Sequence, residues 1–343
     1  MACGCCIVPG DVLKRFSRDR RLSGPQRTAF RNTLRVEAQW RELRSLQSRG
    51  SALLTQAQPR AAVVAAKPAV TVYDCRHGTT LPGAPIARPG SATDQTARRA
   101  YTTTTALAKF YLAVFGRNSV DAQGATLQSS IHYGVKYNNA FWNGVQMTYG
   151  DGDGAIFRDF TRADDVIGHE LTHGVTQYSA QLGYEDEAGG LNESMSDVFG
   201  SMFRQWRARQ SVSAADWLIG SELMGSGAKA RGYSCLRDMA DPGARHCLAP
   251  QPGHYRDYQD GMDPHYSSGI ANRAFYLAAM AIGGSSWELT GQIWYRALTA
   301  FEPSPSLTMK AFANRTRQLA RSDYADSAAV PGAIDKAWQD VGL

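Results

Sequence analysis

The sequence predicts an α+β fold in which a β-rich part of the chain precedes a helical part. Apolar residues alternate with polar ones between residues 126 and 149, as expected for strands with one buried face. From Asp164 onward the apolar residues recur at helical spacing instead. The pattern contains neither strand–helix–strand alternation nor an internal repeat, which disfavours a parallel α/β sheet and a solenoid.

The N-terminal part of the chain differs in composition from the rest. Residues 10–50 are basic and helix-forming, with Arg and Leu interspersed, whereas residues 61–72 are mostly small and lead into a strand. The change occurs at Pro59–Ala61, so we place a boundary near residue 60. The predicted units are residues 1–60, 61–177 and 178–343.

Strands are predicted before helices along the body of the chain. Two strands joined by a turn at residues 138–144 each place apolar side chains on one face: Ile131, Tyr133 and Val135, then Val145, Met147 and Tyr149. Three helices follow, beginning at Asp164, near Asn192 and near Gly269. The C-terminal residues contain three further candidate helices.

Charge is distributed unevenly. The 343 residues carry a net charge of +6, but residues 1–60 hold 12 Lys and Arg against four Asp and Glu, or +8. The remainder holds 25 against 27 and is slightly acidic. We therefore expect the basic segment to dock on the acidic body. We expect no nucleic-acid partner, because no recognised binding motif accompanies the charge, and we expect a monomer.

Composition also limits the class of protein. An apolar fraction of 43% with 20% charged residues is typical of a globular protein rather than a disordered chain. The longest apolar run, Phe275–Ile282, falls short of the roughly 20 residues that span a bilayer. Residues 1–9 lack signal-peptide features, so we expect a cytoplasmic precursor or secretion by a non-standard route. Whether Cys235 and Cys247 form a disulfide is left open by the sequence.

The sequence His169-Glu170-Leu171-Thr172-His173 is the central motif. Its histidines are four residues apart, so on a helix both imidazoles lie on one face and can bind one cation. Glu170 lies about 100° around the helix from His169, where it can accept a proton from metal-bound water. The alternative interpretation is two surface histidines on a helix.

A second motif supplies the ligand that this pair lacks. Catalytic zinc takes three protein ligands and leaves its fourth position for water. Glu193 follows His173 by 20 residues and shares a helix face with Asp197. Glu193 can complete the zinc site, and Asp197 can accept the outer N–H of a ligand histidine and so orient it.

Together these motifs resemble the thermolysin family of zinc endopeptidases. The segments that carry the resemblance are residues 168–176, 190–197, 138–144, 236–242, 264–270 and 337–342. The resemblance covers roughly residues 70–343. It implies a two-lobed zincin fold, with a β-rich N-terminal lobe, an α-helical C-terminal lobe and the HExxH helix on the floor of the cleft. It also implies peptide hydrolysis with one catalytic zinc ion.

The resemblance assigns roles outside the two motifs. It implies that His265 and Tyr184 hydrogen-bond the developing oxyanion and that Asp260 orients His265. Substrate would bind as an added strand held by three residues, Asn139, Ala140 and Arg237. The pocket for the residue just after the scissile bond would be lined by Phe157, Phe160, Val166 and Leu236.

Longer members of the family bind paired calcium ions near the helix ends, and this chain departs from that pattern. Asp165 and Asp216 match two ligand positions, but Arg204, Leu218 and Ser221 stand where other acids are expected. A guanidinium is not a calcium ligand. We therefore expect Arg204 to replace the ions by pairing with Asp165 or Asp216, and calcium is not an expected cofactor.

The N-terminal segment Cys5–Pro9 resembles the start of the short propeptides of protealysin-like members of the family. A thiolate is a good zinc ligand. Cys6 is therefore predicted to occupy the fourth zinc position and keep the enzyme latent, with Cys3 and Cys5 as alternatives. The other interpretation is that these are ordinary reduced thiols.

The sequence thus predicts a zinc metalloendopeptidase, made as a self-inhibited precursor, that cuts before an apolar residue. Its expected partners are peptide or protein substrates and its own propeptide. The alternatives are a catalytically silent binding protein on the same fold, a zinc aminopeptidase, and a metal-binding module built on the N-terminal cysteines. The complete ligand set disfavours the silent protein, and no acidic motif for gripping a free amine is present.

Overall fold

The structure is a computed structural model that describes residues 6–51 and 68–343. The predicted boundary near residue 60 and the alternative thiols Cys3 and Cys5 lie outside the described residues. Within the part of the chain that is described, no helix has the length and apolar character needed to cross a membrane.

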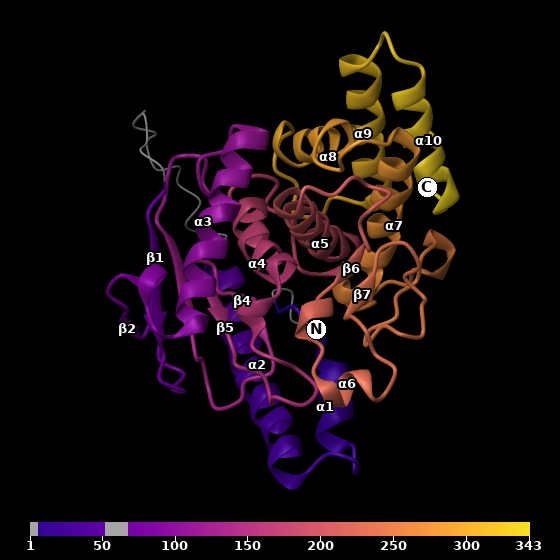
Figure 1. The fold of residues 1–343 in the computed structure, drawn as a ribbon. Coiled ribbons are helices and arrows are strands. Elements are labelled where there is room, and N and C mark those ends of the chain that lie inside the picture. Colours follow the sequence, from indigo (N-terminus) through magenta and orange to yellow (C-terminus); the bar gives the residue numbers. More distant parts are fainter. Residues whose placement is uncertain (1–5, 52–67) are drawn as a thin grey trace.

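A five-stranded sheet forms the core of the N-terminal lobe (Figure 1). Its strands are β1 (Val70–Asp74), β2 (Ala84–Pro85), β3 (Leu127–Ile131), β4 (Ala140–Trp142) and β5 (Met147–Tyr149). Their order is β2-β1-β3-β5-β4, with β1, β3 and β5 parallel and the two edge strands antiparallel to their neighbours. β4 lies inside the predicted turn, and Val135 is exposed outside any strand. The β4 edge faces the cleft described below.

Helix α3 (Gln95–Phe115) connects β1 to the parallel strand β3, so the lobe contains one β–α–β unit. Neither the helix nor this unit was predicted from the sequence. Thr102–Thr105 are four consecutive β-branched residues of low helix propensity, which obscure the helical pattern. The helix is nevertheless well delimited. Asp94 accepts a hydrogen bond from the N–H of Thr96 at its start, and Gly116 ends it in a left-handed conformation.

The later helices confirm the predicted order of strands first and helices second. The helices are α4 (Asp164–Gln177), α5 (Asp186–Ala208), α6 (Ser226–Lys229), α7 (Pro264–Ile282), α8 (Leu289–Thr299), α9 (Met309–Asp323) and α10 (Ala329–Asp340). Two short strands, β6 (Leu218–Ile219) and β7 (Arg237–Asp238), pair antiparallel. α5 begins earlier than predicted because Asp186 and Glu187 form its first turn, where acidic side chains favour a helix N-terminus.

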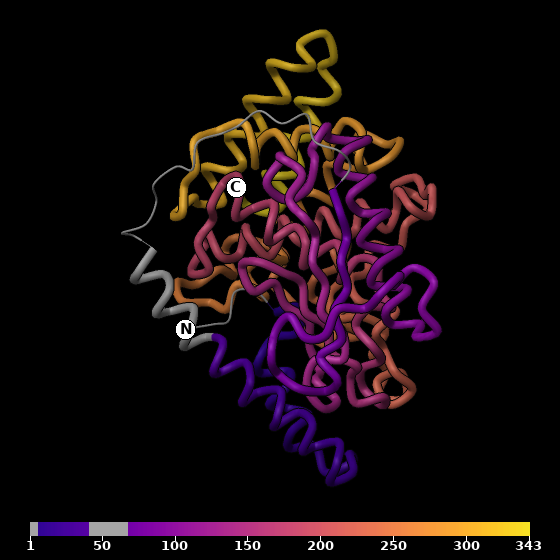
Figure 2. Tube along the Cα trace, turned by 90° about the vertical axis from the view of Figure 1, so that its left-hand side faces the viewer, coloured from indigo at the N-terminus to yellow at the C-terminus, as the bar shows by residue number. Residues whose placement is uncertain are grey.

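Two helices, α1 (Gly10–Arg18) and α2 (Gly24–Ser51), form a hairpin that projects from the body (Figures 1 and 2). The ring of Phe16 lies 5.3 Å from that of Phe30. Both rings contact Phe157 of the body, at centroid distances of 6.5 and 6.2 Å. The N-terminal segment is therefore attached to the body by buried aromatic contacts.

Arg204 of α5 lies between two acids at the positions compared above with calcium ligands. Its Nη1 lies 3.7 Å from Asp165 Oδ2 and donates to Ser221 Oγ at 3.2 Å, and its Nη2 contacts Asp216. The expected ion pairing is therefore present. We predict that metal analysis of the purified protein will find zinc and no calcium. Two tightly bound calcium ions per chain would contradict this prediction.

His132 bridges two carboxylates of the N-terminal lobe. Its Nδ1 lies 2.7 Å from Asp151 Oδ1, and its Nε2 lies 2.7 Å from Asp94 Oδ2 at the start of α3. The hydrogen bond to Asp151 is the largest influence on its pKa. Together with the hydrogen bond to Asp94, it outweighs the effect of burial and raises the pKa of His132 to about 9.

We predict that this bridge stabilises the fold at neutral pH and weakens in alkali. An unfolded histidine titrates near pH 6.5. Since the folded pKa is higher, the stabilisation is complete below about pH 6.5 and disappears as the pH rises through about 9. The wild type should unfold at a higher temperature than His132→Gln at about pH 6. The difference should shrink towards about pH 10, and a constant difference would count against the prediction.

Candidate active site

Helix α4 places the two motif histidines on one buried face. The helix begins with Asp164 and Asp165, whose negative charges favour a helix N-terminus. One turn separates His169 from His173, and their Nε2 atoms lie 3.1 Å apart. Both side chains are buried. The histidine pair is thus available to one cation.

Helix α5 crosses α4 where both helices carry glycine. A Cβ added to Gly168 would lie 2.7 Å from the Cα of Gly200, so a side chain there would force the helices apart. This close approach brings Glu193 of α5 to the histidine pair. Its Oε2 lies 3.4 Å from His169 Nε2, and its Oε1 lies 3.6 Å from His173 Nε2. The three predicted ligands therefore converge.

Hydrogen bonds on the far side of each imidazole orient it. His169 Nδ1 lies 2.9 Å from Asp197 Oδ1, and His173 Nδ1 lies 3.0 Å from Asn192 Oδ1. Because both partners accept, we infer that each Nδ1 carries the proton and that each Nε2 presents its lone pair to the site. Asp197 occupies its predicted place, whereas Asn192 had no predicted role although it precedes Glu193 in the motif.

Asp197 is surrounded by donors. Arg237 Nε donates to its Oδ2 at 2.8 Å and Nη2 donates to its Oδ1 at 2.7 Å, while Asn272 Nδ2 donates at 2.9 Å. Burial would raise the pKa of this carboxyl, but the charge of Arg237 and the hydrogen bond of His169 hold it well below its usual range. The charged carboxylate therefore stays in place to orient His169.

The donor set fits one zinc ion. Tetrahedral bonds of about 2.0–2.1 Å from zinc to nitrogen and oxygen place neighbouring donor atoms about 3.3 Å apart. The two Nε2 atoms lie 3.1 Å apart, and each has one carboxylate oxygen of Glu193 nearby, Oε2 at 3.4 Å from His169 and Oε1 at 3.6 Å from His173. Two imidazole lone pairs and a carboxylate also face one another in this buried site, and a cation between them would offset the free-energy cost of burying them. His169, His173 and Glu193 are the residues that would hold it.

Glu170 lies beside the ligands and is completely buried. The hydroxyl of Tyr149 on β5 has a pKa raised well above its ordinary value, first by burial and then by the charge of Glu170. The carboxylate of Glu170 therefore acts on the hydroxyl of Tyr149 as well as lying in the motif beside the ligand histidines.

His265 stands at the start of α7 and is oriented by the residue that caps this helix. Asp263 Oδ1 accepts from the N–H of His265 at 3.0 Å and lies 2.7 Å from its Nδ1. Asp263 thus takes the role expected for Asp260, because the turn into Pro264 brings the nearer carboxylate back onto the ring. Burial opposes the imidazolium, but Glu193 and Asp263 raise the pKa of His265 to about 10.

We predict that Asp263→Asn will lower kcat for peptide hydrolysis about tenfold, because a neutral partner holds the charged ring less firmly. Zinc content and KM should change little. Asp260→Asn is the matched control and should leave kcat unchanged. A loss of kcat in the control variant alone would restore Asp260 to this role.

Residues 6–9, called the N-terminal strand below, lie antiparallel to the edge of β4 and pair with it in one bridge. The N–H of Ile7 donates to the carbonyl of Ala140 at 3.2 Å. Cys6 pairs with Phe141 in an isolated antiparallel bridge. The edge of the sheet is therefore covered by an antiparallel segment of the same chain.

Side chains predicted to bind substrate hold the main chain of this strand. Asn139 Oδ1 accepts from the N–H of Val8 at 2.9 Å, and its Nδ2 donates to the carbonyl of Val8 at 3.1 Å. Arg237 Nη1 donates to the carbonyl of Ile7 at 2.9 Å. These contacts involve peptide groups alone, so another peptide could make them in the same way.

The Cys6 carbonyl oxygen, rather than its sulfur, faces the site and contacts His265 Nε2. The side chain belongs to a separate cluster with Cys75, Tyr133, Tyr137 and Phe141. Among the described residues, the ligand group at the site contains no sulfur. The structure thus departs from the prediction of a Cys6 thiolate on zinc, because the direction of the paired strand turns the carbonyl towards the site and the side chain away from it.

The four residues predicted to line the apolar pocket are all buried and belong, like Ile7 and Val8, to the main hydrophobic core of the protein. They are Phe157, Phe160, Val166 and Leu236. The rings of Phe157 and Phe160 lie 5.6 Å apart. Ile7 is completely buried in this core, where an apolar side chain is favoured.

Two polar residues of α2 reach the same strand edge, and no sequence motif marks them. Thr33 Oγ1 accepts from the N–H of Asn138 at 3.0 Å, and the carboxylate of Glu37 accepts from Asn139 Nδ2. Both side chains are buried. Their four-residue spacing places them on one face of the helix, and this is the sequence pattern that could have indicated that they act together. Tyr184 lies half-buried between α4 and α5, and its role at an oxyanion stays a prediction.

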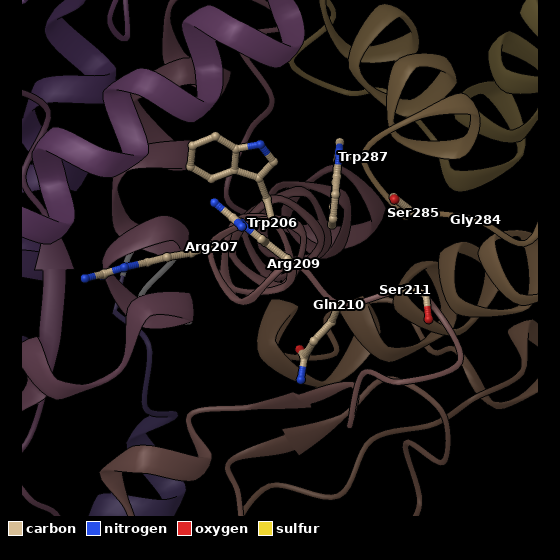
Figure 3. A pocket seen from close by; sticks show the side chains of 8 residues that line it. All are labelled: Trp206, Arg207, Arg209, Gln210, Ser211, Gly284, Ser285 and Trp287. Atoms are coloured by element: carbon tan, nitrogen blue, oxygen red, sulfur yellow. The ribbon is translucent and has the colours of Figure 1, made fainter.

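A cavity of about 660 Å³ lies at the C-terminal end of α5, away from these residues (Figure 3). Trp206 and Trp287 stand on two sides of it, with Arg209 and Gln210 on its lining. None of the predicted catalytic or zinc-binding residues lines this cavity. The cleft at the ligand group is filled by the N-terminal strand instead.

Known proteins resemble both lobes of the chain. Residues 41–177 match the catalytic domain of thermolysin metallopeptidases, and residues 180–343 match their α-helical domain. An extracellular metalloprotease of Pectobacterium carotovorum subsp. carotovorum is 42% identical over 284 residues, which cover 80% of each chain. Thermolysin of Alicyclobacillus acidocaldarius subsp. acidocaldarius is 35% identical over 285 residues, or 80% of this chain and 51% of that protein.

The similarity extends to a solved structure with a comparable N-terminal segment. The precursor of protealysin, a metalloproteinase from Serratia proteamaculans, has a TM-score of 0.83 and 37% sequence identity. The match covers 98% of this chain and 99% of that one, and so includes the helices before the sheet. With the His169, His173 and Glu193 ligand set in place, these similarities show that the chain belongs to the thermolysin family of zinc metalloendopeptidases.

Proposed function

We propose that this chain is the latent precursor of a zinc endopeptidase, in which residues 6–9 occupy the substrate cleft of the same molecule. The observation that carries the proposal is the set of main-chain contacts made by Asn139, Ala140 and Arg237 to this segment. A peptide substrate can use these contacts once the segment has left. We assign the inhibitory propeptide to residues 1–60.

The bound segment supports an assignment of the positions around the scissile bond. The carbonyl of Cys6 faces His265 and lies at the place of a scissile carbonyl. The next carbonyl, that of Ile7, is bound by Arg237. Ile7 therefore stands for the substrate residue just after the bond that is cut. Since this residue is completely buried among apolar side chains, we expect cleavage before apolar residues.

The residues around the ligand group have distinct proposed roles. Zinc bound there would acidify water and polarise a carbonyl group. Glu170 would accept a proton from the attacking water and deliver it to the nitrogen of the leaving amine. His265 and Tyr184 would donate hydrogen bonds to the carbonyl oxygen as negative charge develops on it.

The alternatives are less well supported. An aminopeptidase needs a cleft that ends before the scissile bond and grips a free amine. Here the Cys6 carbonyl at His265 precedes Ile7, so the chain continues on the amino side of the proposed bond. A catalytically silent protein has no need for the complete ligand set together with a buried Glu170.

The proposal is tested by mass spectrometry of the purified protein, incubated with casein in the presence and absence of a zinc chelator. We expect self-cleavage near residue 60 and casein fragments that begin with apolar residues. Both should stop with the chelator and return when zinc is added. Casein left intact in all samples, or cleavage that is insensitive to the chelator, would refute the proposal.

A further inference from the structure

Cys235 and Cys247 face one another at the two ends of a loop beside the cleft. They are paired in an isolated parallel bridge, and their sulfur atoms lie 3.6 Å apart. Both side chains are buried, with exposures of 0 and 1%. Main-chain hydrogen bonds hold the pair in register, from Leu248 N to the Cys235 carbonyl at 3.0 Å and from Ser234 N to the His246 carbonyl at 3.0 Å.

Two cysteines in register on neighbouring extended segments have side chains directed to the same side. Their Cα atoms are then separated by about 5 Å, within the range that a disulfide bridges. We propose that Cys235 and Cys247 form an oxidation site, at which an intrachain disulfide closes the loop that carries Leu236 and Arg237.

The surroundings of the pair favour this reaction. The hydrogen bond from Cys247 is the largest influence that lowers the pKa of Cys235, and Ser234 and His246 lower it further. His246 Nδ1 lies 3.5 Å from the sulfur of Cys235. Two thiols become one S–S bond by losing two protons and two electrons. A disulfide oxidant such as oxidised glutathione accepts them and becomes two thiols.

The same side chains also resemble part of a metal site, but the set is incomplete. Cys235, His246 and Cys247 bring three ligand atoms together, and among the residues described here no fourth donor joins the group. Asp238 lies 3.3 Å from Nε2 of His246, on the outer side of the ring. Structural zinc sites are closed by four protein ligands. The pair of buried thiols is therefore better suited to bond covalently.

The bridge would act on the substrate-binding edge of the cleft. Arg237 lies two residues after Cys235 and binds both Asp197 and the carbonyl of Ile7. The carbonyl of Leu248, next to Cys247, accepts from Arg15 Nη2 of α1 at 2.8 Å. Both ends of the loop thus contact the N-terminal segment, and these two contacts are lost when the segment is removed. A covalent link would hold Arg237 in place in the mature enzyme.

The experiment compares the full-length protein after treatment with reduced or oxidised glutathione, followed by alkylation of free thiols and peptide mapping. In the oxidised sample we expect a cross-linked peptide pair containing positions 235 and 247, separated by reduction. The oxidised protein should also unfold about 4 °C higher than the reduced protein.

Two variants complete the test. In the double variant Cys235→Ser/Cys247→Ser, oxidised and reduced samples should unfold at the same temperature. Cys75→Ser removes another buried thiol and should retain the cross-link. If the double variant does not fold, the peptide map of the oxidised wild-type protein by itself tests whether the disulfide forms. Full alkylation of both cysteines after oxidation, a cross-link to another cysteine, or thiols protected until a chelator removes a metal would each overturn the proposal.

Discussion

Replacing Glu170 with glutamine will leave the zinc content unchanged and lower peptide hydrolysis about 10³-fold. Glutamine has nearly the same size as glutamate, so the helix and the ligands His169, His173 and Glu193 remain in place. It cannot accept the proton of an attacking water. The change therefore removes a catalytic step and leaves the metal site intact.

Zinc content and turnover of a fluorogenic peptide should be measured on the same preparation. Glu193→Gln is the matched control, because the same chemical change at a ligand should lower zinc content and turnover together. Self-cleavage of the precursor offers an independent measure and should slow in parallel in Glu170→Gln. Near-wild-type turnover of Glu170→Gln would overturn its assignment as the general base.

Replacing Ile7 with aspartate will release the latent state. Ile7 is completely buried, and its peptide groups bind Ala140 and Arg237. Placing a carboxylate in this apolar cluster costs several kcal/mol, because the charge loses its hydration without a dedicated partner. The uncleaved precursor should therefore hydrolyse a small peptide at least about tenfold faster than the wild-type precursor.

The initial rate should be recorded together with chain length on a gel, so that activity of the uncleaved chain is separated from activity after processing. Lys14→Asp introduces the same acid at an exposed position of α1 and should leave latency unchanged. An uncleaved Ile7→Asp precursor as inactive as the wild type would contradict the assignment of residues 6–9 as the inhibitory strand.

The ligands and Glu170 could be predicted because they depend on local geometry. A helix places residues four apart on one face, so the spacing of His169 and His173 already implies a shared cation. Glu193 and Asp197 follow the same rule on the next helix. Helix α3 was not predicted because burial of its threonine-rich face in the tertiary structure, rather than intrinsic helix propensity, stabilises it.

The orientation of the inhibitory strand could not be predicted in this way. Whether the sulfur or the carbonyl of Cys6 faces His265 depends on how the segment pairs with β4, more than 130 residues away in the chain. The choice of Asp263 over Asp260 depends on a turn whose path is decided by the start of α7. Such contacts join distant residues and leave no periodic pattern in the sequence.

The sequence by itself determined the family and the zinc ligands, because helical periodicity and family motifs are carried by short segments. Only the tertiary structure decided that Gly168 and Gly200 let the two ligand helices meet, that the N-terminal strand lies along the sheet edge, and that its carbonyl faces the site. The physical reason is that these features depend on packing and hydrogen bonding between segments far apart in the chain.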